Sequence, residues 1–252
     1  MIRVPVICFA AHPDDETIGA GGHLFYWPEA RIVHATDGAP RDMEDGRRYG
    51  FATREAYAAA RRLELVEALE LAGIDPERAT SLGIVDQECC RNLVPMIRGI
   101  LNLLSDVMPA TIVAPPYEGG HPDHDSLAFA VHTACRLLGD RAPRILEYAL
   151  YHAAAGEFRS GDFIPARGAR SITVQLSRRA SSIKRRMLEC FVTQQNTLAP
   201  FQTAIENFRV APVYDFTQPP HSGILFYDQF PWGVKGAEWR EMAAQATREL
   251  GL

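Results

Sequence analysis

The sequence lacks the features that mark several classes of protein. It contains no uninterrupted apolar run of about 18 residues, the length that a membrane-spanning helix needs. Lys and Arg together number 26 against 31 Asp and Glu, so the formal net charge of −5 offers no basic surplus to a nucleic acid. We therefore expect a protein with neither a membrane span nor a nucleic-acid partner.

Cysteine is scarce, and its spacing excludes common structural roles. None of the five cysteines forms a pair with the CxxC spacing typical of metal sites. An odd number of such residues is typical of reduced thiols, which predicts a cytoplasmic protein without structural disulfides. For the adjacent Cys89 and Cys90, a strained redox pair is the alternative to plain burial. The short apolar run before His12 contains Pro5, so we interpret it as a core strand rather than a signal peptide.

The sequence does contain a regular alternation of strand-like and helix-like segments. A chain of 252 residues can bury a full core, and we expect one domain over residues 1–252, with a core in about 1–200 and a C-terminal elaboration after about 200. The expected strands cover residues 4–10, 31–36, 80–85, 111–114, 145–151 and 172–176. The expected helices cover residues 17–27, 51–72, 94–107, 126–138 and 178–191. This alternation predicts an α/β fold with a parallel sheet covered by helices on both faces.

The first polar motif reads Ala-His-Pro-Asp-Asp-Glu over residues 11–16 and follows the first expected strand. His12 and Asp15 can reach one metal ion, because zinc favours imidazole nitrogen and carboxylate oxygen as ligands. The side chain of Asp14 diverges from that of Asp15 and could act as a general base towards a water that the metal activates. The alternative is a plain turn in which Asp15 caps the next helix.

The second polar motif runs from Gly119 to Asp125, in the loop after the fourth expected strand. One histidine could complete a metal set of two histidines and one aspartate. The other, held protonated by a nearby carboxylate, could donate to the oxyanion of a tetrahedral intermediate. A polar loop with a capping aspartate is the alternative. In a doubly wound sheet the first and fourth strands commonly flank the point where strand order reverses, so we expect the two motifs to meet there.

Both motifs resemble signatures of a known family, the LmbE-like or PIG-L de-N-acetylases. Residues 11–16 resemble the family's AHPDDE signature, and residues 120–124 resemble its GHPDH signature. Residues 36–39 are similar to a TDG segment after the second strand, and residues 53–56 to the start of a long helix. Lys184 with Gln194 is similar to a later K…SQ pattern. The resemblance covers roughly residues 1–200 and implies a Rossmann-like three-layer sandwich with a mostly parallel sheet.

The resemblance also implies roles for individual residues. His12, Asp15 and His124 match the zinc ligands, and Asp14 matches the general base. The remaining implied roles are an imidazolium at His121 that stabilises the oxyanion, a supporting and orienting aspartate at Asp123, and a substrate contact at Arg54. One Zn²⁺ per chain is implied, with Fe²⁺ or another divalent ion as an alternative, because a set of two histidines and one carboxylate accepts several metals.

The implied activity is hydrolysis of an N-acetyl group from a GlcNAc-type amino sugar. The expected partner is a small N-acetylated sugar or glycoconjugate, and a homo-oligomer is a further expectation. Two alternatives are an amidase acting on a larger N-acyl or conjugate amide, and a non-catalytic metal- or sugar-binding protein of the same fold. The intact Asp14 beside intact ligands argues against the second alternative, because a family member that no longer catalyses hydrolysis is expected to have lost its general base.

The sequence departs from the family pattern at two positions of the second motif. Gly119 stands where some members carry a tyrosine, and the nearest tyrosine is Tyr117. The acid that protonates the leaving amine is therefore open between His121 and Asp14. Asp125 replaces the basic or apolar residue often found there, and we expect it to cap the following helix rather than to bond a histidine.

Three further features are less decisive. Glu16 either supports a metal-bound histidine or carries charge at a helix N-terminus. The basic residues between Arg178 and Arg186, which include Lys184, are interpreted as a solvated helix face. The polar segment 41–48 is either a mobile lid over the site or a surface loop.

Overall fold

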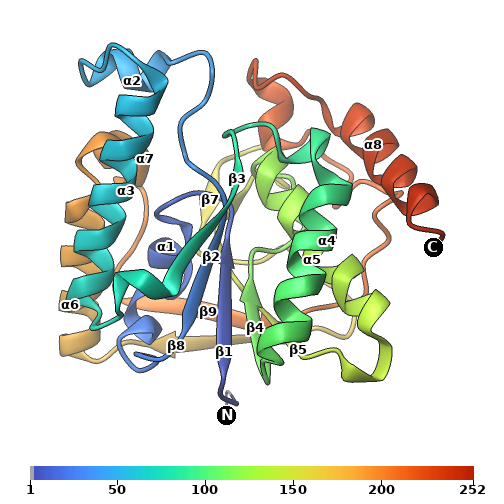
Figure 1. Cartoon of the computed structure of the whole chain (residues 1–252), viewed down its shortest axis with the longest axis horizontal. Coiled ribbons are helices and arrows are strands. Elements are labelled where there is room, and N and C mark those ends of the chain that lie inside the picture. Colours follow the sequence, from blue (N-terminus) through green and yellow to red (C-terminus); the bar gives the residue numbers. More distant parts are fainter. Residues whose placement is uncertain (1–2) are drawn as a thin grey trace.

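One seven-stranded sheet forms the centre of the molecule (Figure 1). The computed structural model describes residues 3–252, and the strand order is β3-β2-β1-β4-β5-β9-β8. The strands are β1 (Val6–Ala10), β2 (Arg31–Thr36), β3 (Ala79–Ile84), β4 (Thr111–Ala114), β5 (Arg144–Tyr148), β8 (Ser171–Gln175) and β9 (Ile205–Val210). Strands β1 to β5 run parallel, whereas β9 is antiparallel to both of its neighbours. Two short strands, β6 (Tyr151–His152) and β7 (Arg159–Ser160), pair separately as an antiparallel ribbon.

Helices cover both faces of the sheet, so that the fold has three layers (Figure 1). One layer contains α1 (Asp15–Leu24), α3 (Arg54–Leu71) and α6 (Arg178–Cys190), with the short α2 (Glu44–Arg48) and α7 (Gln195–Leu198) on the same side. The other layer contains α4 (Leu93–Val107), α5 (Pro122–Leu138) and α8 (Gly236–Glu249). Short 3-10 helices lie at Pro76–Arg78, Cys89–Arg91, Gly139–Arg141, Val192–Gln194 and Phe226–Gln229. The predicted α/β fold with a mostly parallel sheet is therefore confirmed.

The core lies on both sides of the central strand β1. Ile7 and Phe9 pack on the side of α4 and α5, while Val6 and Cys8 pack on the side of α1 and α3. A strand covered on both faces must be apolar at every position, which is why the sequence shows a continuous apolar run here instead of alternation. All five cysteines are free thiols, and Cys89 and Cys90 are buried, in agreement with plain burial.

The point where strand order reverses lies between β1 and β4, as predicted. These strands are adjacent and parallel, so the segments that follow them meet at the same edge of the sheet. Two helices begin earlier than predicted, α1 at Asp15 and α5 at Pro122. The expectation that the second motif is a loop is wrong for residues 122–125, because Pro122 opens α5 and these residues form its first turn, whereas Gly119 and Gly120 remain in the loop and His121 caps the helix.

Residues after about 200 contribute to the sheet and to the core. Strand β9 lies between β5 and β8, and Trp239 of α8 is fully buried against the layer that contains α5. The indole N–H of Trp239 donates to the hydroxyl of Ser126 at 2.8 Å. Within residues 3–252, no helix combines the length and apolarity that crossing a membrane requires.

Candidate metal centre

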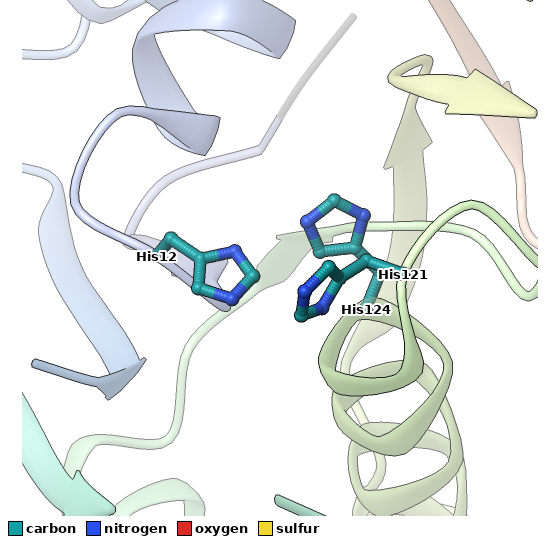
Figure 2. A group of neighbouring side chains, drawn as sticks. All are labelled: His12, His121 and His124. Carbon is teal, nitrogen blue, oxygen red and sulfur yellow. The ribbon is translucent and has the colours of Figure 1, made fainter. Parts of the chain in front are cut away.

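Three histidine rings face one another where the two motifs meet (Figure 2). His12 follows β1, whereas His121 and His124 lie at the start of α5. The ring centroid of His12 lies 4.5 Å from that of His121 and 5.2 Å from that of His124, and the latter two are 5.3 Å apart. Their ring nitrogens form a group within 4.8 Å of one another that could hold a metal ion. The predicted meeting of the two motifs is therefore confirmed.

Asp15 places a carboxylate next to the rings of His12 and His124. Its Oδ1 lies 3.1 Å from His124 Nε2, and its Oδ2 lies 3.3 Å from His12 Nδ1. Two ligand atoms at about 2.0–2.1 Å from a tetrahedral zinc ion are roughly 3.3 Å apart. Each of the two ring nitrogens lies at about this separation from a different oxygen of Asp15. His124 Nε2 is buried and, although Asp15 Oδ1 lies 3.1 Å away, it makes no hydrogen bond within residues 3–252. This nitrogen is therefore available to bind a metal ion. By donor chemistry, two imidazole nitrogens and a carboxylate oxygen, His12, Asp15 and His124 are suited to a divalent ion.

The protein holds Asp15 as a carboxylate. The backbone N–H groups of Ala11 and His12 donate to Oδ2 at 3.0 and 2.8 Å, which fixes the side chain and leaves Oδ1 towards His124. Burial by itself would raise the pKa of Asp15, but the neighbouring rings of His124 and His12 hold that pKa well below its ordinary value. The ligand is therefore charged over the whole physiological range.

Two carboxylates support the far side of the His12 ring. His12 Nε2 lies 3.1 Å from Asp86 Oδ1 and 3.4 Å from Asp123 Oδ2. Burial lowers the pKa of His12, but Asp86 and Asp15 raise it to a net value above the ordinary one. A carboxylate at one ring nitrogen fixes the tautomer and orientation of a histidine that binds metal through the other nitrogen. This arrangement leaves Nδ1 of His12 for the ion.

Asp86 was not predicted from the sequence. It follows β3, whose carboxyl end lies at the same sheet edge as those of β1 and β4, and that position was the available signal. His12, Asp86 and Asp123 form a second group with donor atoms within 4.8 Å. The backbone N–H groups of Gln87 and Cys89 already donate to the carboxylate of Asp123 at 2.7 and 3.0 Å, so this group is better described as the support of the His12 ring.

Asp14 lies beside the metal group in a constrained backbone conformation. Its φ of 144° is one that residues other than glycine rarely adopt, and such strain clusters at functional sites. The guanidinium of Arg61 donates to Asp14 Oδ2 at 3.0 Å and to the carbonyl of Pro13 at 2.7 Å, while Glu16 accepts from the N–H of Asp14 at 3.2 Å. Burial raises the pKa of Asp14 to about 8, although Arg61 acts to lower it.

His121 caps α5 with its side chain. Its Nδ1 accepts the backbone N–H of Asp123 at 3.1 Å, so the hydrogen of the neutral ring is on Nε2. Burial, together with the neighbouring rings of His12 and His124, holds the pKa of His121 well below its ordinary value. The expectation of a carboxylate that keeps His121 protonated is not met, because Asp123 directs its carboxylate to His12. His121 instead offers an N–H donor from a neutral ring.

A cavity of about 170 Å³ opens beside these side chains. Asp14, Arg61 and Asp86 line it together with the three histidines and Asp15. Its more apolar lining includes Tyr57, Tyr151, Leu198, Phe201 and Trp232. A small water-accessible space beside a carboxylate, a neutral N–H donor and a metal-ligand set is suited to hydrolysis of a polar carbonyl group.

The family follows from a comparison of the sequence with known families. The family model described as GlcNAc-PI de-N-acetylase, PIG-L, matches residues 7–135, just over half of the chain. The chain belongs to the PIG-L family. The resemblance predicted from the two motifs is thereby confirmed, and family membership indicates a de-N-acetylase of amino-sugar substrates. No curated protein sequence matches this PIG-L family member.

Solved structures share its fold. The zinc-inhibited form of teicoplanin deacetylase Orf2 is 14% identical over 83% of this chain and 99% of that chain, with a TM-score of 0.62. N,N'-diacetylchitobiose deacetylase from Pyrococcus horikoshii is 20% identical over 90% of this chain and 87% of that chain, with a TM-score of 0.59. GalB, the 4-carboxy-2-hydroxymuconate hydratase from Pseudomonas putida KT2440, is 16% identical over 83% and 97%, with a TM-score of 0.54. At these identities the likeness shows the fold alone.

Arg61, rather than Arg54, is the arginine that reaches the site of this PIG-L family member. Arg54 donates to the carboxylate of Asp37 and, at 3.3 Å, to the carbonyl of Ala39, and it is not among the residues that line the cavity. A substrate contact by Arg54 stays a prediction. The signal for Arg61 was present, because it falls in the buried stripe of α3 that includes Tyr57 and Leu65.

Other expectations for the second motif differ from the structure. Asp125 does not cap α5; it lies within the first turn, and its Oδ1 accepts the N–H groups of Glu118 and Gly119 at 3.2 and 3.0 Å. Asp125 therefore fixes the loop before the helix. The hydroxyl of Tyr117 donates to the carbonyl of Gln218 at 2.9 Å, so this tyrosine does not serve the site.

Glu16 and Lys184 are buried and have structural roles in this PIG-L family member. Glu16 lies 2.9 Å from the ring of His34, which is not one of the metal-site histidines. Lys184 is not part of a solvated face, because its ammonium donates to the carbonyl of Ile18 at 2.7 Å and to Glu206 at 2.9 Å. The arginines that flank Lys184 are exposed, as predicted.

The remaining polar segments approach the rim of the cavity. The segment expected to be a lid or a surface loop contains α2, and its Asp45 lines the cavity. Gln194, the second residue of the weak family pattern, also lines the cavity and donates to the hydroxyl of Tyr57 at 2.7 Å.

Proposed function

We propose that this PIG-L family member is a zinc-dependent hydrolase that removes the acetyl group from a GlcNAc-type amino sugar. The observation that carries the proposal is the buried donor set of His12, Asp15 and His124 with Asp14 beside it. A bound Zn²⁺ would act as a Lewis acid that polarises the amide carbonyl and activates a water molecule. Fe²⁺ is the alternative ion, since the same donors accept several divalent metals.

Asp14 is the general base of the proposed reaction. Its carboxylate lines the cavity, and Arg61 holds it in place at 3.0 Å. A base is most effective when its pKa lies near the working pH. Burial raises the pKa of Asp14 to about 8, and a cation bound beside it would lower that value and favour the carboxylate that accepts the proton. Asp14 accepts a proton from the attacking water, whose oxygen forms the new bond to the carbonyl carbon.

His121 stabilises the negative charge that then develops on the former carbonyl oxygen. Because its Nδ1 accepts a backbone N–H, Nε2 carries the hydrogen and can donate to that oxygen. A neutral His121 has no extra proton for the leaving amine. Asp14 therefore returns the proton it took from water, the C–N bond breaks, and acetate and the free amine leave.

The size of the cavity supports an acetyl group over a large acyl group. About 170 Å³ is small beside the roughly 300–1,000 Å³ of pockets that enclose drug-sized ligands. An acetamido group with part of its sugar suits this space, whereas a long acyl chain would have to extend beyond it. An amidase acting on larger acyl groups is therefore the less favoured alternative. The intact Asp14 disfavours a protein that only binds metal or sugar.

The proposal is tested by measuring the free amine that the metal-loaded protein releases from each substrate, together with acetate from the acetylated ones. The panel contains N-acetylglucosamine, N,N'-diacetylchitobiose and N-decanoylglucosamine, with His124→Ala as the variant that lacks a metal ligand. We expect acetate from the acetylated sugars, no hydrolysis of the decanoyl amide, and neither bound zinc nor turnover in the variant. Hydrolysis of the decanoyl amide alone would favour the larger amidase, and zinc retained by His124→Ala would refute the ligand set.

A further inference from the structure

Six aromatic side chains lie side by side next to the metal centre, and we call them the aromatic wall. Its members are Tyr151, Phe158, Phe201, Phe226, Phe230 and Trp232. All six lie outside residues 7–135, the segment that the family model matches. Phe158 is 42% exposed and the other five are half-buried, and Tyr151 and Phe201 also pack against the core, so the wall runs from the core to the surface.

The wall begins at the metal centre and runs outward from it. The Trp232 ring lies 4.6 Å from the His121 ring, and Phe230 stacks on Trp232 at 4.6 Å with an interplanar angle of 15°. Phe226 continues the series at 4.9 Å from Phe230, and Phe158 follows at 5.4 Å from Phe226. These contacts form an unbroken path of ring faces and edges from the reaction site to the surface.

The other end of the path returns to the metal centre. Tyr151 lies 5.6 Å from Phe158 and 5.3 Å from the ring of His124, a proposed ligand. Tyr151, Phe201 and Trp232 line the cavity as well as belonging to the wall. A molecule whose acetyl group occupies the cavity would therefore have the rest of its structure beside these rings.

The glycine pair of the second motif positions the wall. The N–H of Phe226 donates to the carbonyl of Gly119 at 2.8 Å, which ties the C-terminal segment to the motif. A Cβ at Gly120 would lie 2.3 Å from the carbonyl oxygen of Tyr151, closer than any side chain permits. Glycine at this position thus lets Tyr151 approach the metal centre.

The chemistry of the wall selects an uncharged, apolar partner. Phe158 gives the wall one exposed end, and Tyr151, Phe201 and Trp232 line the cavity, so apolar surface continues from the cavity to solvent. Within residues 3–252, Arg61 is the only Arg or Lys that lines the cavity, and it is paired with Asp14. Asp45 and Asp86 also line the cavity, so a phosphate group next to the sugar would meet carboxylates without a free cation.

We propose that the aromatic wall binds an aromatic aglycone, so that the substrate is an N-acetylated amino sugar attached to an aryl group. The inference rests on the proposed deacetylase function and names its substrate class. The rings present both stacked and edge-to-face geometries, with interplanar angles from 15° to 78°, and aromatic groups favour these two arrangements. An aryl group can pack on such a surface in the same two ways, whereas an alkyl chain makes neither.

The inference is tested by comparing three glycosides and the free sugar as substrates of the metal-loaded full chain. The probes are N-acetylglucosamine, its 4-nitrophenyl glycosides in both anomeric forms, and its octyl glycoside, with kcat and KM measured by acetate release. We expect KM for one of the 4-nitrophenyl glycosides to be about tenfold lower than for the free sugar, as one well-placed aromatic contact would give. An equal KM for the free sugar and both aryl glycosides, or a lower KM for the octyl glycoside than for either, would overturn the inference.

Phe158→Ala tests the wall itself. Phe158 is exposed, so its removal leaves the core intact, and we expect the ratio of the aryl to the free-sugar KM to move towards one. The matched control is Tyr26→Ala, because Tyr26 is 56% exposed and lies beyond the end of α1, outside the wall and the cavity. The same ratio in Phe158→Ala as in the wild type would contradict the inference, as would an equal change in both variants.

A binding measurement distinguishes failure of the deacetylase proposal from failure of the aromatic-wall proposal. Calorimetric titration of the zinc-loaded Asp14→Asn variant with the 4-nitrophenyl glycosides and with the free sugar needs no turnover. Preferential binding of an aryl glycoside without acetate release from the wild type would support the wall and refute the deacetylase. Equal binding of the aryl and free sugars would refute the wall, whatever the wild type releases.

Discussion

Two neighbouring aspartates of the same motif have different environments, and these environments predict different roles. Asp15 accepts two backbone N–H groups and faces two histidine rings, so it remains a carboxylate suited to a metal ion. Asp14 has a strained backbone, a single arginine partner and access to the cavity, so it can exchange a proton. At the scale of single residues, the division of labour between them is the main expectation of the account.

Asp14→Asn should keep the metal and lose most turnover. An amide of the same shape can still accept from Arg61 but cannot take a proton from water. General-base catalysis typically contributes about 100- to 10,000-fold, so a loss in that range is expected. Zinc content by elemental analysis and kcat by acetate release check this, with Asp15→Asn as the control that should lose zinc. A near-normal kcat in Asp14→Asn would remove Asp14 from the mechanism.

Arg61→Met should lower kcat while zinc content stays normal. Without the guanidinium, the carboxylate of Asp14 loses its 3.0 Å partner, and the carbonyl of Pro13 loses its 2.7 Å donor. A base that is no longer held in position acts less effectively, and a loss of at least tenfold is a rough expectation. Arg54→Met is the matched control, because the ion pair of Arg54 with Asp37 lies outside the cavity lining. A larger loss in Arg54→Met than in Arg61→Met would favour the role that the family resemblance gave to Arg54.

The sequence predicted most of the site and missed two of its residues. His12, Asp14, Asp15, His121 and His124 belong to two compact motifs, and their types alone suggest metal chemistry. Asp86 carries no motif, and its relevance depends on the sheet edge at which β3 ends. Arg61 lies in the interior of α3, where an arginine usually faces solvent, and only the fold shows that its side chain is buried.

At the scale of elements, the His121 side chain at the start of α5 has two roles, one in capping the helix and one in the proposed chemistry. His121 caps the helix through Nδ1 and directs Nε2 away from that backbone bond. Pro122 occupies the first helical position, where its missing N–H leaves no hydrogen bond unmade. Stability and chemistry at this site are therefore coupled through one residue, and two substitutions can separate them.

His121→Asn and His121→Ala should differ in stability but not in turnover. Asparagine is a good N-cap and alanine is a poor one, so the alanine variant should be less stable by about 0.5–2 kcal/mol. Both variants lack the ring N–H proposed to stabilise the oxyanion, so both should lose turnover by a similar factor. Urea unfolding and acetate release measure the two effects. Full activity in His121→Asn would show that the ring is needed for the helix alone.

The limits of element prediction have identifiable physical causes. The predicted start of α5 was late because His121, Pro122 and Asp123 are also typical loop residues, and only the cap geometry shows that the helix begins among them. Strand β9 was not predicted because the adjacent Glu206 and Asn207 break the alternation typical of a strand, and the region around it is aromatic and Pro-rich. Strand β1 was predicted well, because a strand buried on both faces is continuously apolar.

At the scale of the whole molecule, the order of the strands is what assembles the site. The parallel strands β1, β3 and β4 end at one edge, so segments more than 100 residues apart in the chain come into contact. This part of the fold could be predicted, because alternating strands and helices constrain the topology strongly. A single domain, a homo-oligomer and a cytoplasmic location stay predictions.

A buried ionic cluster joins β9 to β5 and to the loop that follows β4. Arg209 donates to Glu147 at 2.6 Å and to Glu118 at 3.0 Å, and Tyr214 donates to Glu147 at 2.6 Å. One guanidinium thus faces two buried carboxyl groups, and Glu147 has the closer contacts. Burial raises the pKa of Glu118 from 4.5 to about 8, although Arg209 acts to lower it. The folded protein therefore holds Glu118 protonated at neutral pH.

This protonation predicts a pH-dependent stability difference between the wild type and Glu118→Gln. A carboxyl whose pKa is raised on folding contributes stability that is complete below its unfolded pKa and is lost as pH rises through about 8. Glutamine is neutral throughout, so the melting temperature of Glu118→Gln minus that of the wild type should be more positive at about pH 9 than at about pH 6. An equal difference at both pH values would mean that Glu118 does not titrate in this range.

The central claim is that one metal ion held by His12, Asp15 and His124 makes this PIG-L family member a de-N-acetylase. The most direct test is to strip the protein of metal, add zinc in sub-stoichiometric steps, and follow acetate release from an N-acetylglucosamine conjugate. The account predicts no activity in the stripped protein and a linear rise that reaches its plateau at one zinc per chain. Full activity in the stripped protein, or a plateau that requires two zinc ions per chain, would contradict it.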